Sequence, residues 1–388
     1  MRIAIDVRLL AQQNKTGIKE YTTGLLRALF LQDRKNVYIL FYNSFKKQNP
    51  KELEEFEKYP NVFIKRYYYP NKLLNLSLTF LRFPKLDKLL KTKVFFLPNI
   101  IFNAFSKNCF LILTLHDLSF LKHREFFSFY QQLWHFLINP GKLIQRADRL
   151  VTVSQSSKND IVNFFNKSKI RKKIKQKTKV IYPGISKDLY FCNKSQDKNK
   201  RIQKKYKLPP KGYILALGTL EPRKNLNSII LAFNYLKKAE KIKQKLVIVG
   251  SFGWLFKETE DLIQNSSFKK DIKLIGQIKD KERKHIYSNA DVFVYPSYYE
   301  GFGFPPLEAL ACKTPVICSH SSSLAEVVGR EALYVNPYAL DELVYAIKIA
   351  LNNRWFWKKN QQNKTQSPEK FNQLKASERF KLLNYHIS

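Results

Sequence analysis

The chain has 388 residues, 44% of them hydrophobic and 14% aromatic, which is enough for two α/β domains with real cores and excludes an intrinsically disordered protein. Its formal net charge of +38 is compatible with nucleic acid, an anionic membrane surface or phosphorylated substrates as partner. The same charge would also arise in a lysine- and asparagine-rich proteome whose exposed positions drift to lysine.

Apolar runs in the first half of the chain predict a parallel sheet that is buried on both faces. A polar loop that contains Gly17 separates the first run from a helical pattern through Tyr21, Leu25 and Leu29. The predicted strands are residues 3–7, 37–42, 62–67, 94–97, 110–115, 150–153 and 180–184. We therefore expect an α/β domain over residues 1–185.

The strand 110–115 ends in a histidine and an aspartate. His116 is a candidate functional residue, because ligands of open α/β sheets bind at the carboxyl ends of strands. A lone histidine can equally be structural. For the neighbouring Asp117 we expect a role in orienting the loop.

A stretch rich in aromatic residues, Phe120–Ile138, predicts one helix with two possible environments. It can lie on a bilayer surface, as basic and aromatic amphipathic helices do, or it can be a core helix with one wet face. We expect the core helix, with its rings buried. The next helix, 154–161, begins with hydroxyl residues that suit N-capping rather than catalysis.

Two basic runs follow, at 167–179 and 194–207. The second is polar throughout and predicts an interdomain linker over residues 186–210. Strands at 213–217, 246–250, 272–275, 292–295, 315–318 and 332–335 then alternate with helices at 226–236, 285–289 and 341–351. This alternation predicts a second α/β domain over residues 211–359.

Cations follow the first strand of this second domain. Arg223 and Lys224 directly precede a helix, where free backbone amides and two positive charges suit a diphosphate group.

The stretch Val292–Val316 is the most informative part of the chain. It starts as a strand, continues as a loop of aromatics, glycines and prolines, and ends as a helix. Glu300 and Glu308 stand eight positions apart, and Gly301 and Gly303 allow a ligand to approach the backbone closely. The pattern predicts a site for a polyhydroxylated, phosphorylated ligand.

The segment YEGFGFPPLEALACKTPVI, which starts at Tyr299, resembles the E-x7-E signature of the retaining GT-B enzymes of glycosyltransferase family 4. The resemblance implies two Rossmann-like domains that face each other across a cleft, with the donor held mainly by the second. It implies a metal-independent enzyme without a cofactor that transfers a hexose from a nucleotide diphosphate sugar with retention. In relatives the last helix returns to the first domain, so we expect the tail 360–388 to pack there.

The resemblance also implies roles for individual residues. Glu300 would bind sugar hydroxyls, Glu308 the ribose diol, and the backbone near Gln277 the base. Most of the family has an arginine where this chain has Thr219, which leaves the role of Arg223 less defined than that of Lys224. The implied catalytic residues are His116, Glu300, Lys224 and Arg223, and the implied donor-binding residues are Gly17, Gly218, Gln277, Gly301, Phe302, Gly303, Phe304 and Glu308.

The segments GTLEPRKN and GWLFKET resemble bacterial polysaccharide mannosyltransferases within that family. They imply GDP-mannose as donor and a surface polysaccharide or lipopolysaccharide as product. A lipid-linked oligosaccharide is the expected acceptor.

Two other functions stay open. One is an inactive GT-B relative that acts as a scaffold, and the other is a basic nucleic-acid-binding protein. Four cysteines without metal-ligand spacing fit a reducing compartment, and charged residues near the N-terminus do not fit a signal peptide. We therefore expect a cytoplasmic protein, either free or peripheral on the inner face of the cytoplasmic membrane.

Overall fold

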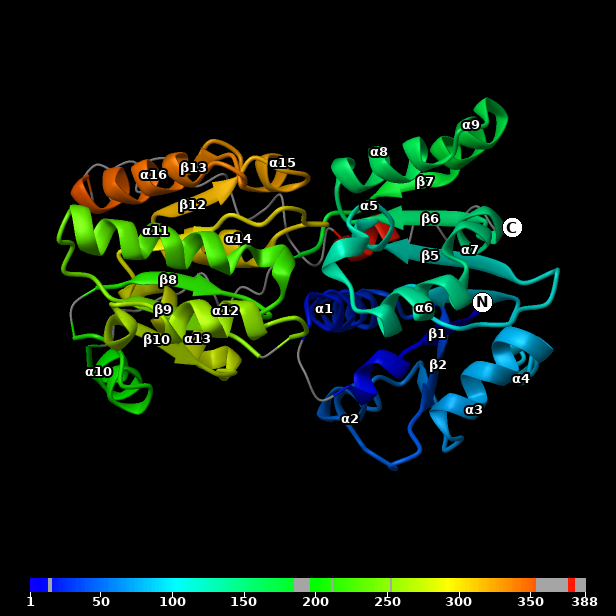
Figure 1. The fold of residues 1–388 in the computed structure, drawn as a ribbon. Coiled ribbons are helices and arrows are strands. Elements are labelled where there is room, and N and C mark those ends of the chain that lie inside the picture. The colour runs from blue at the N-terminus through cyan, green and yellow to red at the C-terminus, as the bar shows by residue number, and fades with distance from the viewer. Residues whose placement is uncertain (13–15, 185–195, 211, 252, 354–375, 381–388) are drawn as a thin grey trace. The chain divides into compact units, whose positions relative to one another are not determined.

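The structure, a computed structural model, describes the chain except for residues 13–15, 185–195, 211, 252, 354–375 and 381–388. The chain forms two compact units, each built around one parallel sheet (Figure 1). Unit 1 comprises residues 1–122, 129–184 and 371–388, and unit 2 comprises residues 123–128 and 185–370. This confirms the expectation of two Rossmann-like α/β domains, whereas their arrangement across a cleft stays a prediction.

Unit 1 has a seven-stranded sheet in the order β3-β2-β1-β4-β5-β6-β7, and every pair is parallel. The predicted strands are confirmed, most of them to within one or two residues. The strands are β1 Arg2–Asp6, β2 Val37–Asn43, β3 Val62–Tyr67, β4 Val94–Leu97, β5 Phe110–Leu115, β6 Arg149–Thr152 and β7 Thr178–Val180.

The helices of unit 1 follow from local signals in the sequence. Thr16 caps α1 by accepting a hydrogen bond from the Lys19 amide at 3.3 Å, and Tyr21, Leu25 and Leu29 form its buried stripe. Ser154 caps α8 in the same way, as predicted. The helices of this unit are α1 Gly17–Gln32, α2 Lys51–Phe56, α3 Asn71–Leu76, α4 Leu86–Leu89, α5 Ser119–Lys122, α6 Phe129–Ile138, α7 Pro140–Arg146, α8 Gln155–Phe164 and α9 Ser168–Lys177, with a 3-10 turn η1 Arg8–Ala11 and a π-helical turn η2 Ser77–Leu81.

Unit 2 has a six-stranded sheet in the order β10-β9-β8-β11-β12-β13, again parallel throughout. Its strands are β8 Ile214–Leu217, β9 Leu246–Val249, β10 Ile272–Ile275, β11 Val292–Tyr295, β12 Val316–Ser319 and β13 Ala332–Val335. Its helices are α10 Gln196–Lys205, α11 Leu226–Ala239, α12 Lys257–Gln264, α13 Asp280–Asn289, α14 Phe304–Ala311, α15 Leu324–Val328 and α16 Leu340–Asn352, with 3-10 turns η3 Arg124–Phe126, η5 Pro222–Lys224 and η6 Lys269–Asp271.

The expected single helix over Phe120–Ile138 is wrong. The segment forms α5, the turn η3 and α6, and its middle part, residues 123–128, belongs to unit 2. There the indole N–H of Trp254 donates to the Phe126 carbonyl, and the Phe127 ring stacks on Trp254 with centroids 6.0 Å apart. These contacts accompany a 3-10 turn in place of a continuous α-helix, so tertiary packing overrides the local α-helical pattern.

The expected burial of the rings in this segment is also wrong for α6. Phe129 is 74% exposed and Phe136 is 77% exposed. Trp134 is half-buried and packs edge-on against Phe102.

The segment that composition marks as a linker, 186–210, contains helix α10. Ile202 and Leu208 are buried in the core of unit 2 beside Ile286 of α13. In the tail, the described residues 376–380 lie in unit 1, where the Phe380 ring packs on Phe96 with centroids 4.5 Å apart. Among the described helices, none has the length and apolar character that crossing a bilayer would require.

Candidate functional site

The candidate site of unit 2 lies where the strand order reverses. Strand β8 pairs with β9 on one side and with β11 on the other, so the loops after β8 and β11 leave the sheet in opposite directions. Such a switch point opens a crevice at the carboxyl ends of the strands, where ligands of these folds bind. The loop after β8 carries Arg223 and Lys224, and the loop after β11 carries Glu300.

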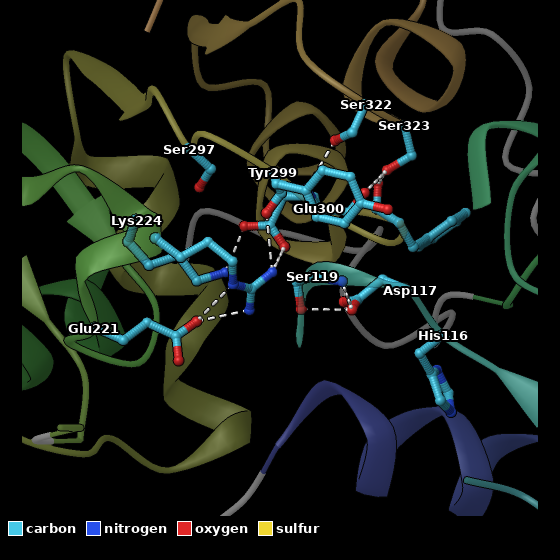
Figure 2. Close-up of polar contacts among 12 residues, drawn as sticks. His116, Asp117, Ser119, Glu221, Lys224, Ser297, Tyr299, Glu300, Ser322 and Ser323 are labelled. Carbon is cyan, nitrogen blue, oxygen red and sulfur yellow. Dashed lines mark hydrogen bonds and ion pairs between the residues drawn. The ribbon is translucent and has the colours of Figure 1, made fainter. Parts of the chain in front are cut away.

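The two cations both contact the one carboxylate. Lys224 Nζ lies 2.6 Å from Glu300 Oε1, and the Arg223 guanidinium lies 3.0 Å from Glu300 Oε2. Glu221 holds the other edge of the guanidinium at 2.6 Å. Figure 2 shows the Lys224 and Glu300 side chains pointing toward one another. Glu221 contacts the Arg223 guanidinium from the side away from Glu300. We call Glu221, Arg223, Lys224 and Glu300 the charge cluster.

Glu300 is fixed from several directions. Its backbone N–H donates to Ser322 Oγ at 2.7 Å, and its carbonyl accepts from Ser323 Oγ at 2.9 Å (Figure 2). The Tyr295 hydroxyl donates to the carboxylate at 2.8 Å. Burial alone would raise the pKa of Glu300, but the charges of Arg223 and Lys224 lower it to about 2. The carboxylate is therefore ionised at neutral pH.

Lys224, the ion-pair partner of Glu300, is also fixed by hydrogen bonds. Its side chain is 11% exposed, and its ammonium group donates to both Glu300 and the Tyr295 hydroxyl, each at 2.6 Å. Burial lowers the pKa of Lys224, and the Glu300 carboxylate opposes that effect. Asn225 follows in the left-handed conformation and donates to the Pro296 and Pro337 carbonyls, which fixes the loop on the end of β11.

The start of helix α14 is built on a glycine that no other residue could replace without strain. Gly303 is the N-cap residue with φ +101°, and a β-carbon there would lie 2.5 Å from Leu324 Cδ2. Pro305 and Pro306 follow in the first turn and carry no N–H group. The Phe304 amide is thus the donor that this turn can offer to an anion.

Glu308 lies one turn further along α14 and is 2% exposed. It accepts from Arg283 at 2.6 Å and from the Tyr287 hydroxyl at 3.0 Å, both from helix α13. Gln277 lies in the exposed loop after β10, at the edge of the sheet. Gly218 follows β8, and a β-carbon there would lie 3.7 Å from Lys224 Cε.

Unit 1 places its two predicted site residues near its own switch point, between β1 and β4. His116 Nε2 lies 2.9 Å from the Pro98 carbonyl after β4, and its ring meets Tyr21 of α1 edge-on, with centroids 4.8 Å apart. Gly17 is the first residue of the same helix α1. Burial lowers the pKa of His116, so the imidazole is neutral at pH 7.

Asp117 orients the loop after β5. Its carboxylate accepts from the amide of Ser119 at 2.9 Å and from the hydroxyl of Ser119 at 2.6 Å (Figure 2).

Several residues of the site were not identified from the sequence. Tyr295 ends an apolar strand, so the sequence predicts a core residue. In the structure its hydroxyl donates a hydrogen bond to Glu300. Ser322 and Ser323 lie more than twenty residues from Glu300, whose backbone they hydrogen-bond, and Arg283 stands in a polar helix without a motif. Only the folded structure joins these separated segments.

Comparison with known proteins shows which sequences and folds this chain resembles. Residues 197–370 match the sequence model of the glycosyl transferases group 1. The chain is 30% identical over 237 residues to O-antigen chain mannosyltransferase B of Escherichia coli, covering 60% of this chain and 58% of that protein. It is 32% identical over 226 residues to O-antigen chain mannosyltransferase RfbU of Salmonella typhimurium, covering 58% and 56%. The chain thus matches less than two thirds of the length of these relatives.

Solved structures share the fold over the whole chain. HepE of Anabaena in complex with UDP and glucose superposes with a TM-score of 0.72 at 15% identity and covers 100% of both chains. WaaG, a glycosyltransferase of lipopolysaccharide biosynthesis, superposes with a TM-score of 0.67 at 14% identity and covers 95% of this chain and 98% of its own. At these identities the likeness shows the fold alone.

Proposed function

We propose that this chain, whose residues 197–370 match the sequence model of the glycosyl transferases group 1, transfers mannose from a nucleotide diphosphate sugar to a growing surface glycan. The charge cluster at the switch point of unit 2 is the observation that carries this proposal. It places two cations and an ionised carboxylate within one crevice. Such a set suits a ligand that has phosphates at one end and hydroxyl groups at the other.

The two cations would serve the leaving diphosphate. Departure of the sugar leaves negative charge on the phosphate oxygens, and donors fixed in advance stabilise that charge without reorganisation. Lys224 and Arg223 are held in place by Glu300 and Glu221 before any ligand arrives. The Phe304 amide at the start of α14 adds a neutral donor.

Glu300 would orient the sugar. A carboxylate with a pKa of about 2 is a hydrogen-bond acceptor and not a general acid at neutral pH. It would therefore accept hydrogen bonds from sugar hydroxyls while its other contacts keep it in place. His116, neutral at pH 7, would act toward the sugar as a hydrogen-bonding group rather than as a cation.

Glu308 would bind the ribose through its diol. Its carboxylate is fixed by Arg283 and Tyr287, so its oxygens have a defined orientation before the donor binds. The backbone near Gln277 would hold the base, and Gly17, Gly218 and Gly301 to Gly303 would line the path of the phosphates and the acceptor.

We infer GDP-mannose as the donor. The names of two relatives, both O-antigen mannosyltransferases, support the mannose, and the segments GTLEPRKN and GWLFKET are the basis for the GDP. We further infer retention of anomeric configuration through same-face attack assisted by the leaving phosphate. The two cations would bind the diphosphate oxygens directly, and the resemblance to metal-independent enzymes supports turnover without an added divalent cation. A lipid-linked oligosaccharide would be the acceptor, and the enzyme would work in the cytoplasm at the inner face of the cytoplasmic membrane.

A panel of nucleotide sugars tests the proposal. Purified protein is incubated with GDP-mannose, GDP-fucose, UDP-glucose and UDP-galactose, and nucleotide diphosphate release is measured with and without EDTA. We expect release from GDP-mannose above the others, unchanged by EDTA, and its loss in Glu300→Gln. Binding and release with none of the donors would favour the inactive scaffold instead, and selective, salt-resistant binding to DNA would favour the nucleic-acid reading.

A further inference from the structure

Helix α6 exposes apolar side chains although the chain around it is densely charged. The protein contains 69 lysine and arginine residues, yet α6, FYQQLWHFLI, contains neither of these nor any acid. Phe129, Leu133 and Phe136 stand at positions i, i+4 and i+7 and are all exposed. This spacing places them on one face of the helix. A solvated helix of this lysine-rich protein would be expected to carry charges there.

A second segment of unit 1 repeats this pattern. Helix α3 and the turn η2 together read NKLLNLSLTFL, with Lys72 as the one charged residue. Leu73, Leu76 and Phe80, at spacings of three and four, are exposed, and Phe80 is 66% exposed. Leu81 and Phe83 extend the exposed apolar surface past the end of η2.

The two segments border a common groove. Thr79 and Arg82 line it from the side of η2, and Leu137 and Lys142 line it from the side of α6 and α7. Its cavity volume is about 240 Å³. Arg82 and Lys142 are both exposed, so the groove carries positive charge between two apolar faces. We call α3, η2, α6 and these two cations the apolar face.

We propose that the apolar face of unit 1 inserts into the headgroup region of an anionic lipid bilayer. Exposed apolar patches of this extent mark an interaction surface, and aromatic rings flanked by cations suit the boundary between headgroups and acyl chains. Arg82 and Lys142 complement anionic headgroups. A partner of this chemistry also explains why η2 and α6 carry no charged residue and α3 carries only Lys72.

The proposal changes the expected character of membrane attachment. Attachment through the basic run 167–179 alone would disappear at high salt, because charge attraction is screened. Insertion of Phe80, Phe129 and Phe136 removes apolar area from water and persists at high salt. The proposal does not rest on the transferase activity, since it follows from the surface of unit 1.

Cosedimentation of the full chain with vesicles tests it. Phosphatidylcholine vesicles and vesicles with added phosphatidylglycerol are compared at low and high salt, without donor or acceptor. The variants are Phe80→Gln with Phe136→Gln, and Arg82→Gln with Lys142→Gln. The matched control is Tyr235→Gln with Tyr345→Gln, two exposed rings of unit 2.

We expect wild type to retain binding to anionic vesicles at high salt. The phenylalanine pair should weaken that binding at least tenfold, the cation pair should reduce the preference for anionic vesicles, and the tyrosine pair should change neither. Complete loss of wild-type binding at high salt, or equal loss in the control, would overturn the proposal. So would a dimer in vesicle-free light scattering that dissociates in the phenylalanine pair, because a second copy would then cover this face. Unchanged thermal unfolding of the variants shows that a loss is not caused by misfolding.

Discussion

Replacing Lys224 by methionine separates a catalytic lysine from a structural one. Methionine keeps most of the length and apolar contact of the lysine stem but removes its charge and both hydrogen bonds, which join Nζ to Glu300 and to the Tyr295 hydroxyl at 2.6 Å. Glu300 retains Arg223 at 3.0 Å and Tyr295 at 2.8 Å, so the carboxylate is not left unpaired. We therefore expect the free energy of unfolding to fall by only about 1–3 kcal/mol.

Lys224→Met should lower turnover by more than its effect on stability would explain. If Lys224 stabilises charge that develops on the leaving diphosphate, its loss should lower kcat/KM by about 10²–10³, or about 2.7–4 kcal/mol. Release of nucleotide diphosphate from GDP-mannose measures kcat/KM, and urea unfolding measures stability. Activity within a few-fold of wild type would refute the catalytic role and leave Arg223 and the Phe304 amide as the groups that serve the phosphates.

Lys237 provides a matched control in the same unit. Its side chain is also 11% exposed, and it pairs with Asp271 at 2.7 Å, on a different part of the sheet. Lys237→Met should cost comparable stability and leave kcat/KM within about twofold of wild type. If both variants lost activity in proportion to their stability, the reasoning about Lys224 would be wrong.

Three further predictions follow from other residues of the site. Glu308→Gln should weaken nucleotide sugar binding about ten- to a hundredfold in calorimetry, since a hydrogen bond to a charged group contributes about 1.5–3 kcal/mol; unchanged affinity would remove Glu308 from the ribose site. The pKa of Glu300 lies at about 2 instead of 4.5, so its contribution to stability is present above pH 4.5 and is lost as the pH falls toward 2. Between pH 5 and 2.5 the wild type should therefore lose more unfolding free energy than Glu300→Gln, and parallel pH profiles would contradict the lowered pKa. Gly303→Ala should destabilise the fold by about 1–3 kcal/mol, because φ is +101° and the new methyl group would meet Leu324; a melting temperature equal to that of wild type would contradict this.

The sequence predicted the sheets well because their strands are continuous apolar runs between polar loops. Lys224 and Glu300 follow strands of the unit 2 sheet, and His116 follows a strand of the unit 1 sheet, as expected from the apolar runs, while their roles toward a ligand stay predictions. The ion pair between Lys224 and Glu300 could not be predicted. Lys224 and Glu300 lie 76 positions apart, and their contact depends on β8 and β11 being neighbours.

The two main errors have a shared cause. The helical pattern of Phe120–Ile138 is interrupted where Phe126 contacts Trp254. The polar segment around α10 forms a helix because Ile202 and Leu208 pack into the core of unit 2. Local composition carries no information on partners that are distant in the sequence. The exposure of the α6 rings was not predicted for a related reason. An aromatic helix has the same sequence pattern whether its rings pack in a protein core or face outward.

The charge cluster also bears on how a product could leave. Its two acids and two bases balance, so an empty crevice is electrically neutral, and Glu300 competes with any phosphate for Lys224 and Arg223. A complete donor would compensate Glu300 with its sugar hydroxyls while its phosphates take the cations. If the chain acts as proposed, the nucleotide left after transfer would carry no sugar, so Glu300 would pair again with Lys224 and Arg223 and would weaken binding of the diphosphate. The same carboxylate that favours the intact donor would thereby hasten turnover and limit inhibition by the product.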